Sequence, residues 1–155
     1  MRSLIVILFA VTSVGLQLSF RFKPLIGGPA FLPIHIIAQV SSSSTRSSGS
    51  FAELDFVPKD PTEASTLALL QGASVRGLIR KKMVNIVDDD KVDGSSGGGR
   101  DDNESLSALC DTLLLSVADS CDEQNLSLLS NNCYHFAYYT YKAVEAYNSA
   151  NGKQE

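Results

Sequence analysis

Histidine and cysteine are scarce in this chain of 155 residues, which has two histidines and three cysteines. Because thiol catalysis needs an imidazole close to the sulfur, few pairs of side chains could provide it. Long basic runs are also lacking, and no Lys/Arg cluster exceeds Arg80-Lys81-Lys82. Together with the net charge of −4, this argues against phosphate-backbone binding, so we expect no nucleic-acid partner.

The three cysteines predict no disulfide bond. Cys110 and Cys121 lie at opposite ends of one predicted helix, and a rise of about 1.5 Å per residue keeps them too far apart to bridge. We therefore expect three free thiols, which argues against an oxidising compartment. The sequons at Asn103 and Asn125 would be glycosylated if the chain entered the secretory route, so their occupancy would report that route.

The first twenty residues differ from the rest of the chain. A short basic start is followed by an apolar stretch from Leu4 to Val14 and then by small residues, with an exit at Ser13-Val14-Gly15 or at Gln17-Leu18-Ser19. This pattern is typical of a secretory signal peptide. We predict the secretory pathway or, if residues 1–20 are the first part of a two-part presequence, the plastid. An uncleaved membrane anchor over residues 4–20 is the alternative, although a span needs about 20 apolar residues.

The remaining chain predicts one α+β domain over residues 34–147, with a small antiparallel sheet packed on helices. A Gly- and Pro-rich lead-in is expected before it (21–33), a disordered loop within it (88–102) and a polar tail after it (148–155). The expected strands are 34–40, 51–57 and 77–87, the first two paired as a hairpin. The expected helices are one capped by Asp60 and ended by Gly72, one over 103–120 and one over 132–146.

The charged and metal-binding motifs are weak. The triplet Arg80-Lys81-Lys82 is typical of a solvated strand edge. The acidic loop lacks the EF-hand spacing, which argues against calcium. The cysteines are separated by ten and eleven intervening residues instead of the close pairs of structural zinc sites. A zinc site from Cys110, Cys121, Cys133 and His135 is therefore disfavoured, and we expect no cofactor.

Cys133 is the candidate nucleophile because it lies in the first turn of the last predicted helix, after a polar cap. The unpaired N–H groups and partial positive charge of a helix N-terminus favour a thiolate, so we predict a lowered pKa for this cysteine. His135 leaves the same helix about 200° around the axis and is a poor base for it. His35 on the first strand is the better candidate, oriented by Asp55 or, as second choice, by Glu53 of the next strand.

A catalytically inactive module is the alternative. Cysteine is among the most buried residue types, and a strand histidine is often a satisfied core residue. In that case Cys133 and His35 would only pack in a binding or structural protein of the same fold.

Two motifs carry a resemblance to a known family. The segments Leu32-Pro33-Ile34-His35 and Asn132-Cys133-Tyr134-His135-Phe136 resemble the histidine strand and the nucleophile helix of circularly permuted papain-like thiol hydrolases. This group includes lecithin:retinol acyltransferase-like proteins and desumoylating isopeptidases. Residues 54–62 are also similar to plant and algal members of uncharacterised function.

The resemblance implies a papain-like arrangement with the nucleophile helix at the C-terminus. It implies Cys133 as nucleophile, His35 as base, Asp55 as orienting group and His135 as a helix-face residue near the site. The expected activity is cysteine-dependent hydrolysis or acyl/peptidyl transfer on an amide, ester or thioester.

Overall fold

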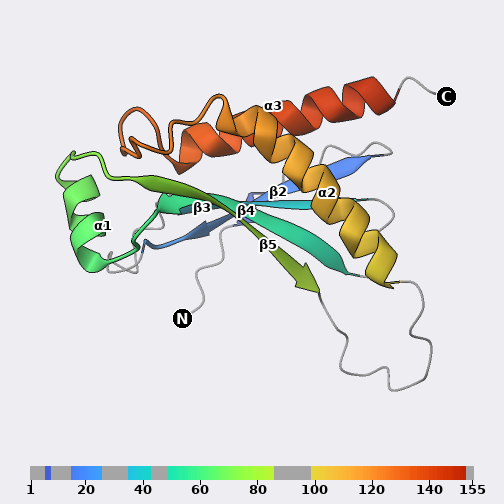
Figure 1. Cartoon of the computed structure of the whole chain (residues 1–155), viewed down its shortest axis with the longest axis horizontal. Helices are drawn as coiled ribbons and strands as arrows, with labels where there is room; N and C mark the ends of the chain where they lie inside the picture. Colours follow the sequence, from blue (N-terminus) through green and yellow to red (C-terminus); the bar gives the residue numbers. More distant parts are fainter. Residues whose placement is uncertain (1–5, 8–14, 26–34, 43–48, 86–98, 153–155) are drawn as a thin grey trace, which may run out of the picture.

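The computed structural model of the chain describes residues 6–7, 15–25, 35–42, 49–85 and 99–152 (Figure 1). One antiparallel sheet has the order β1-β2-β3-β4-β5. It consists of four long strands, with the two-residue strand β1 added at one edge. The predicted α+β class is confirmed, as is a last helix that begins with the cysteine. In chain order the elements are β1 (Val6–Ile7), β2 (Leu16–Lys23), β3 (His35–Ser42), β4 (Ser50–Pro58), α1 (Glu63–Leu70), β5 (Gly77–Asn85), α2 (Gly99–Ala118) and α3 (Cys133–Asn151).

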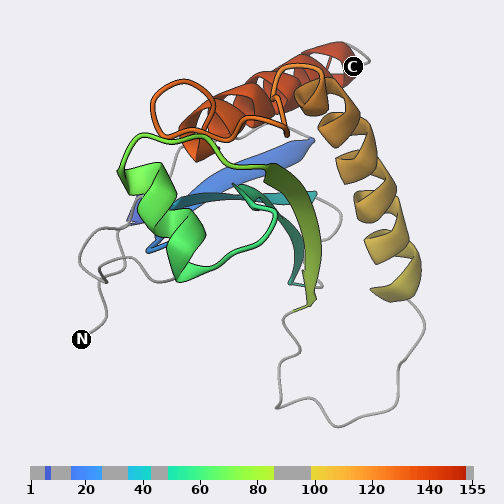
Figure 2. The same cartoon turned by 60° about the vertical axis from the view of Figure 1, so that its left-hand side comes forward.

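Helices α2 and α3 lie side by side on one face of the sheet, while α1 lies beyond one end of the strands (Figures 1 and 2). Strand side chains alternate between faces, so every second residue of β2, β3 and β4 points toward these helices. The core between the layers contains Leu16, Leu18, Ala38, Val40, Ala52, Leu54 and Phe56 from the sheet, and Leu106, Cys110, Leu113, Val117, Phe136 and Val144 from the helices.

The predicted hairpin of β3 and β4 is confirmed, and its register separates two sets of residues. Ile37 pairs with Asp55 and Ala38 pairs with Leu54. Since Ala38 and Leu54 face the helices, Asp55 projects from the opposite face, and so does His35, two residues before Ile37. The pairing of β3 with β4 ends at Ile37, whereas β3 stays paired with β2 as far as His35.

The N-terminal boundary of the domain was predicted too late in the chain. Leu16–Lys23 is strand β2, which places Leu16 and Leu18 in the core at 1% and 5% exposure. The irregular lead-in is therefore wrong for residues 21–23, whereas residues 26–33 lie outside the described part. Processing of the leader stays a prediction, but an exit at Ser19 would remove two core leucines, and one at Gly15 would leave β2 whole.

Two helix starts also differ from the predictions. Helix α1 is capped by Thr62 instead of Asp60, because the Thr62 hydroxyl accepts a hydrogen bond from the N–H of Ser65 at 3.2 Å. Gly72 ends α1 as predicted, with φ of +85°. Helix α2 begins at Gly99, inside the loop predicted over 88–102, and the loop residues before 99 lie outside the described part.

The polar tail predicted over 148–155 is wrong for residues 148–151, because α3 continues to Asn151. Asn148 is 8% exposed and binds both backbone groups of Leu16, accepting from its N–H and donating to its carbonyl at 2.9 Å each. The end of the last helix therefore fixes the start of β2.

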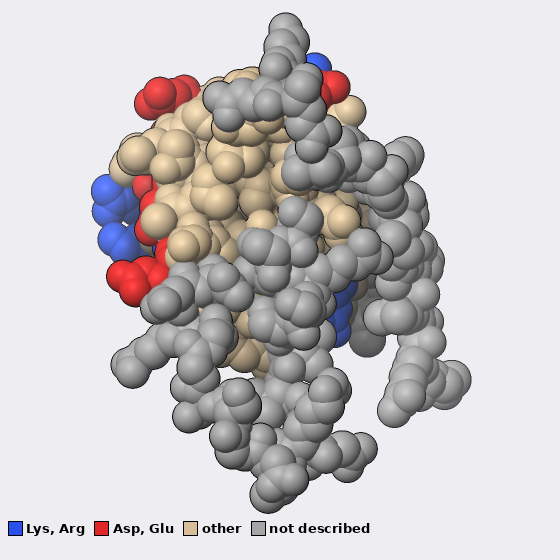
Figure 3. Space-filling view, turned by 90° about the vertical axis from the view of Figure 1, so that its right-hand side faces the viewer, with Lys and Arg blue, Asp and Glu red and all other residues tan. Residues whose placement is uncertain are grey.

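None of the three cysteines, all within the described residues, forms a disulfide bond, as predicted; all three are buried, and Cys110 is a core residue. Burial raises the pKa of Cys110 and Cys121 to about 11 each. Within the described residues, no helix is both long and apolar enough to cross a bilayer. In Figure 3 most of the described surface in view is uncharged, and acidic and basic side chains gather mainly along its left-hand side.

Candidate active site

Cys133 occupies the first position of α3, and Asn132 is the N-cap before it. The Asn132 Oδ1 accepts hydrogen bonds from the N–H groups of Tyr134 at 2.9 Å and His135 at 3.1 Å. The Asn132 side chain also donates to the carbonyl of Leu128, which ties the helix start to the preceding loop. The polar cap predicted from the sequence thus fixes where the cysteine enters the helix.

The thiol of Cys133 lies in a small apolar cluster with Ile36 of β3 and Ala137, one turn further along α3. Burial raises the pKa of Cys133, and the nearby charge of Asp55 raises it further. The backbone N–H groups of Ile36, Cys133 and Tyr134 act in the opposite direction but do not compensate. The predicted lowering of this pKa is therefore wrong, because the desolvation of a thiol with 6% exposure outweighs the field of the helix N-terminus.

His35 and Asp55 form the hydrogen bond predicted between the two strands, with 3.1 Å between Nε2 and Oδ2. Both side chains are buried, at 7% and 9% exposure. Burial by itself raises the pKa of Asp55, but the hydrogen bonds from His35 and Arg80 lower it below its usual value. The carboxylate is therefore ionised and can only accept, so Nε2 carries a proton and, in the neutral ring, Nδ1 presents a lone pair.

Arg80 is a site residue that the sequence reasoning missed. Its guanidinium donates from Nε to Oδ1 of Asp55 at 2.9 Å and from Nη2 to Oδ2 at 2.6 Å. Arg80 lies directly opposite Asp55 in the β4–β5 register, so it is bound at the edge where a solvated side chain was predicted. The signal in the sequence was a basic residue that could pair with an acidic one across neighbouring strands. Finding that pair requires the register of β4 against β5, which could not be predicted from the sequence.

The second ring nitrogen of His35 is unpartnered. Nδ1 is buried and has no hydrogen-bond partner among the described residues. Since a buried polar atom without a partner costs roughly 1–3 kcal/mol, such an atom calls for an explanation, and a catalytic role is one. This nitrogen is also the one on which the Asp55 contact leaves a lone pair.

The thiol and the imidazole lie near the same end of the sheet but do not share a hydrogen bond. The Cys133 sulfur lies against the N–H of Ile36, the residue after His35, and close enough to Asp55 to sense its charge. The His35 side chain, however, projects from the sheet face opposite to the one that α3 covers. The structure thus joins His35 to Asp55 and places Cys133 on the other side of the same strand, against Ile36, without a contact between the ring and the sulfur.

The two alternatives considered for the site have other partners. Glu53 accepts a hydrogen bond from Gln39 at 3.1 Å and lies 3.8 Å from Arg21. His135 Nδ1 lies 2.9 Å from the Asn132 Oδ1 and belongs to the helix cap. No group of three or more His, Cys, Asp or Glu residues that could hold a metal ion occurs in the described parts of the chain.

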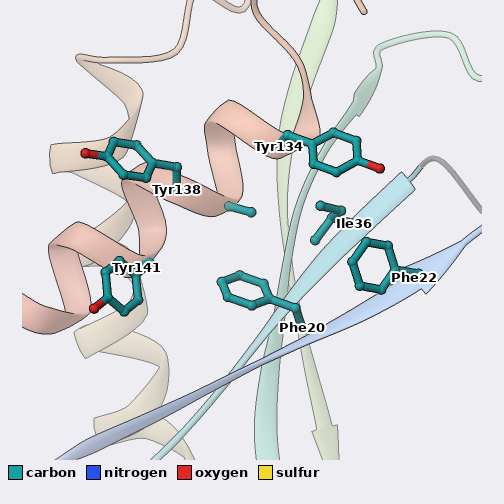
Figure 4. Close-up of a pocket in the computed structure, with 7 residues that line it drawn as sticks. Phe20, Phe22, Ile36, Tyr134, Tyr138 and Tyr141 are labelled. Atoms are coloured by element: carbon teal, nitrogen blue, oxygen red, sulfur yellow. The ribbon is translucent and has the colours of Figure 1, made fainter. Parts of the chain in front are cut away.

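Two pockets flank this end of the sheet. The smaller, of about 150 Å³, lies on the face of His35, Asp55 and Arg80 and reaches Pro61 and Thr66 near α1. The larger, of about 390 Å³, lies between the sheet and α3 (Figure 4). We call it the aromatic pocket, and it is lined by Phe20, Phe22, Ile36, Tyr134, Ala137, Tyr138 and Tyr141.

Comparison with known proteins gave no match to a family model, a curated protein or a solved structure.

Proposed function

We propose that the protein is a cysteine-dependent hydrolase or acyl/peptidyl transferase that acts on an ester, thioester or amide, with Cys133 as nucleophile and His35 as base. Asp55 orients the ring, and Arg80 holds Asp55. A strand histidine, a carboxylate on the next strand and a cysteine at the start of the last helix are the parts expected of a circularly permuted papain-like thiol hydrolase.

The observation that carries the proposal is the buried Nδ1 of His35, whose lone pair is unused while Nε2 is held by an ionised Asp55. A core histidine with a purely structural role would be expected to satisfy both ring nitrogens. A thiol at a capped helix start lies beside the same strand, and it is the nearby group that such a base can deprotonate.

The reaction begins when Nδ1 of His35 takes the proton of the Cys133 thiol and the sulfur forms a bond to the substrate carbonyl carbon. Because the raised pKa of Cys133 keeps the resting sulfur protonated, this base is required for attack at neutral pH. The ring and the thiol must first rotate into contact, and catalytic hydrogen bonds often tighten only when substrate binds.

The tetrahedral intermediate then collapses, the bond from carbon to the leaving oxygen, sulfur or nitrogen breaks, and His35 returns its proton to the leaving group. The acyl group stays on Cys133 as a thioester. In hydrolysis, a water molecule gives a proton to Nδ1 as its oxygen adds to the carbonyl carbon. The carbon–sulfur bond then breaks, the acid leaves, and the proton returns to the sulfur.

A site-resolved acylation experiment tests this proposal. We expect a small thioester, such as the acetyl thioester of N-acetylcysteamine, to leave an acetyl group on Cys133 that mass spectrometry of the digested protein locates. The adduct should be lost in Cys133→Ala and kept in Cys110→Ala and Cys121→Ala. Equal acetylation of all three cysteines, or none on Cys133, would contradict the proposal.

A binding or structural module is the second candidate, and two observations favour it. The pKa of Cys133 is raised by burial, and the His35 side chain projects from the sheet face opposite to the one against which Cys133 packs. If this candidate is right, Cys133→Ser should leave every binding property of the protein unchanged, and no acyl adduct should form in the wild type.

A further inference from the structure

The aromatic pocket shares two of its lining residues with the apolar cluster around Cys133. Ile36 and Ala137 line the pocket and also pack against Cys133. A group bound in the pocket would therefore lie against the two residues that pack on Cys133, although Cys133 itself is not among the lining residues. Its volume of about 390 Å³ lies within the range of about 300–1,000 Å³ that is usual for small-molecule sites.

The lining of the pocket is apolar except for three phenol groups. Figure 4 shows the rings of Phe20 and Phe22 on the β2 side, with those of Tyr134, Tyr138 and Tyr141 along α3. The three hydroxyl oxygens point away from the space between the rings. Tyr134 and Tyr138 are 50% and 56% exposed, so their hydroxyl groups lie toward solvent at the rim.

This lining distinguishes between two kinds of substrate. A peptide would bring one N–H and one carbonyl group per residue into the pocket, and each costs free energy when it is buried without a partner. An alkyl chain brings no polar group and gains from contact with the aromatic rings. None of the described lining residues is charged, so they give no partner to an ionised chain.

We infer that the aromatic pocket binds the apolar acyl group, an alkyl chain, of an ester or thioester whose carbonyl carbon is attacked by Cys133. This inference rests on the proposed function and adds the class of substrate. The chain lies between Phe20 and Phe22 of β2 and the tyrosines of α3. Ala137 lines the pocket and packs against Cys133, so a larger side chain at this position would compete with the alkyl chain for space.

Binding to the Cys133→Ala protein tests the pocket without any reaction. We would titrate it with the acetyl, hexanoyl and decanoyl thioesters of N-acetylcysteamine and measure the affinity by isothermal titration calorimetry. Because each buried methylene adds affinity, we expect an increase of at least about tenfold from hexanoyl to decanoyl. Ala137→Leu should weaken decanoyl binding by about tenfold or more, whereas Ala146→Leu, on the exposed part of the same helix, should not change it.

Tyr138→Ser provides a second variant in case Ala137→Leu does not fold, because Tyr138 is more than half exposed. It should weaken decanoyl binding severalfold. Affinity that is independent of chain length, or equal in Tyr138→Ser and Ala146→Leu, would overturn the inference. N-acetylphenylalanine amide binding as tightly as the decanoyl thioester would also overturn it, in favour of a peptide.

The two proposals fail in different ways. Acetylation of Cys133 in the wild type without any dependence of binding on chain length would leave the thiol chemistry standing and remove the acyl-chain site. Chain-length-dependent binding without an adduct on Cys133 would remove the catalytic proposal, and with it the role of the pocket as a substrate site.

Discussion

Asp55 is the residue on which the geometry of the site depends. Its carboxylate accepts from Nε2 of His35 and from two nitrogens of Arg80 while it is buried itself. A buried carboxylate is costly unless such partners are present, so each of the three side chains holds the other two in place. His35 and Asp55 could be predicted from the sequence, because strand alternation and a hairpin suffice to bring them together.

Asp55→Asn should destabilise the protein in a pH-dependent way. The amide keeps the shape and removes the charge, and since Arg80 is half exposed we expect a loss of about 2 kcal/mol in the free energy of unfolding at pH 7. The folded state holds the pKa of Asp55 below its unfolded value of about 3.9. This stabilisation is therefore complete above that value and is lost as the pH falls through the folded pKa.

Urea unfolding of both proteins between pH 3 and pH 7 measures the difference. The lowered pKa values of Asp122 and Glu145 affect both proteins equally and cancel in the comparison. A difference between wild type and Asp55→Asn that stays constant over this range would show that the charge of Asp55 is not what stabilises the site.

At the scale of elements, strand β2 has a clear sequence signature that was passed over in favour of the leader pattern before it. Residues 16–23 alternate strictly between apolar and polar side chains, which is the signature of a half-buried strand. The apolar stretch before them is typical of a leader, so residues 16–20 were assigned to that leader and residues 21–23 to an irregular lead-in. Thr62 and Gly72 account for the two ends of α1, and Asn132 caps the start of α3. The length of α3 could not be predicted, because Asn148 is a polar residue buried by a tertiary contact.

The contact between the end of α3 and the start of β2 predicts a large effect of Asn148→Ala. Truncation leaves the N–H and carbonyl groups of Leu16 buried without partners, at a cost of about 2–4 kcal/mol for the two. Asn151→Ala is the matched control, because Asn151 is exposed and bonds only to the carbonyl of Tyr147, so we expect less than about 0.5 kcal/mol. Equal urea midpoints for the two variants would contradict this account of β2.

Two N-terminal truncations test where the fold begins. Removal of residues 1–15 leaves β2 whole, whereas removal of residues 1–19 deletes Leu16 and Leu18 from the core. Each buried leucine contributes about 1.5–3 kcal/mol, which together is a large part of the 5–15 kcal/mol that is usual for a domain. We expect the shorter truncation to unfold cooperatively and the longer one to aggregate or to lose its thermal transition. Two equally stable products would show that β2 is dispensable.

At the scale of the whole molecule, the class of fold and its layers followed from the order of strands and helices. The positions of the candidate site residues relative to the two faces of the sheet could not be predicted in this way. His35, Asp55 and Arg80 lie on one face, while the aromatic pocket lies on the other, against α3. Cys133 packs against Ile36, beside the strand end where the β3–β4 ladder has stopped. Sequence periodicity assigns residues to faces, but it does not determine where a helix start meets a strand end.

The central claim is that His35 deprotonates Cys133, and the pH dependence of alkylation at that one sulfur tests it most directly. The rate of reaction with iodoacetamide would be measured at Cys133 by mass spectrometry in the wild type, in His35→Gln, whose amide can still donate to Asp55, and in His135→Gln as control. We predict that His35→Gln slows alkylation at pH 7 on the order of tenfold or more and shifts the profile toward the high pH of an unassisted buried thiol. His135→Gln should behave like the wild type. Identical profiles for His35→Gln and the wild type would contradict the account.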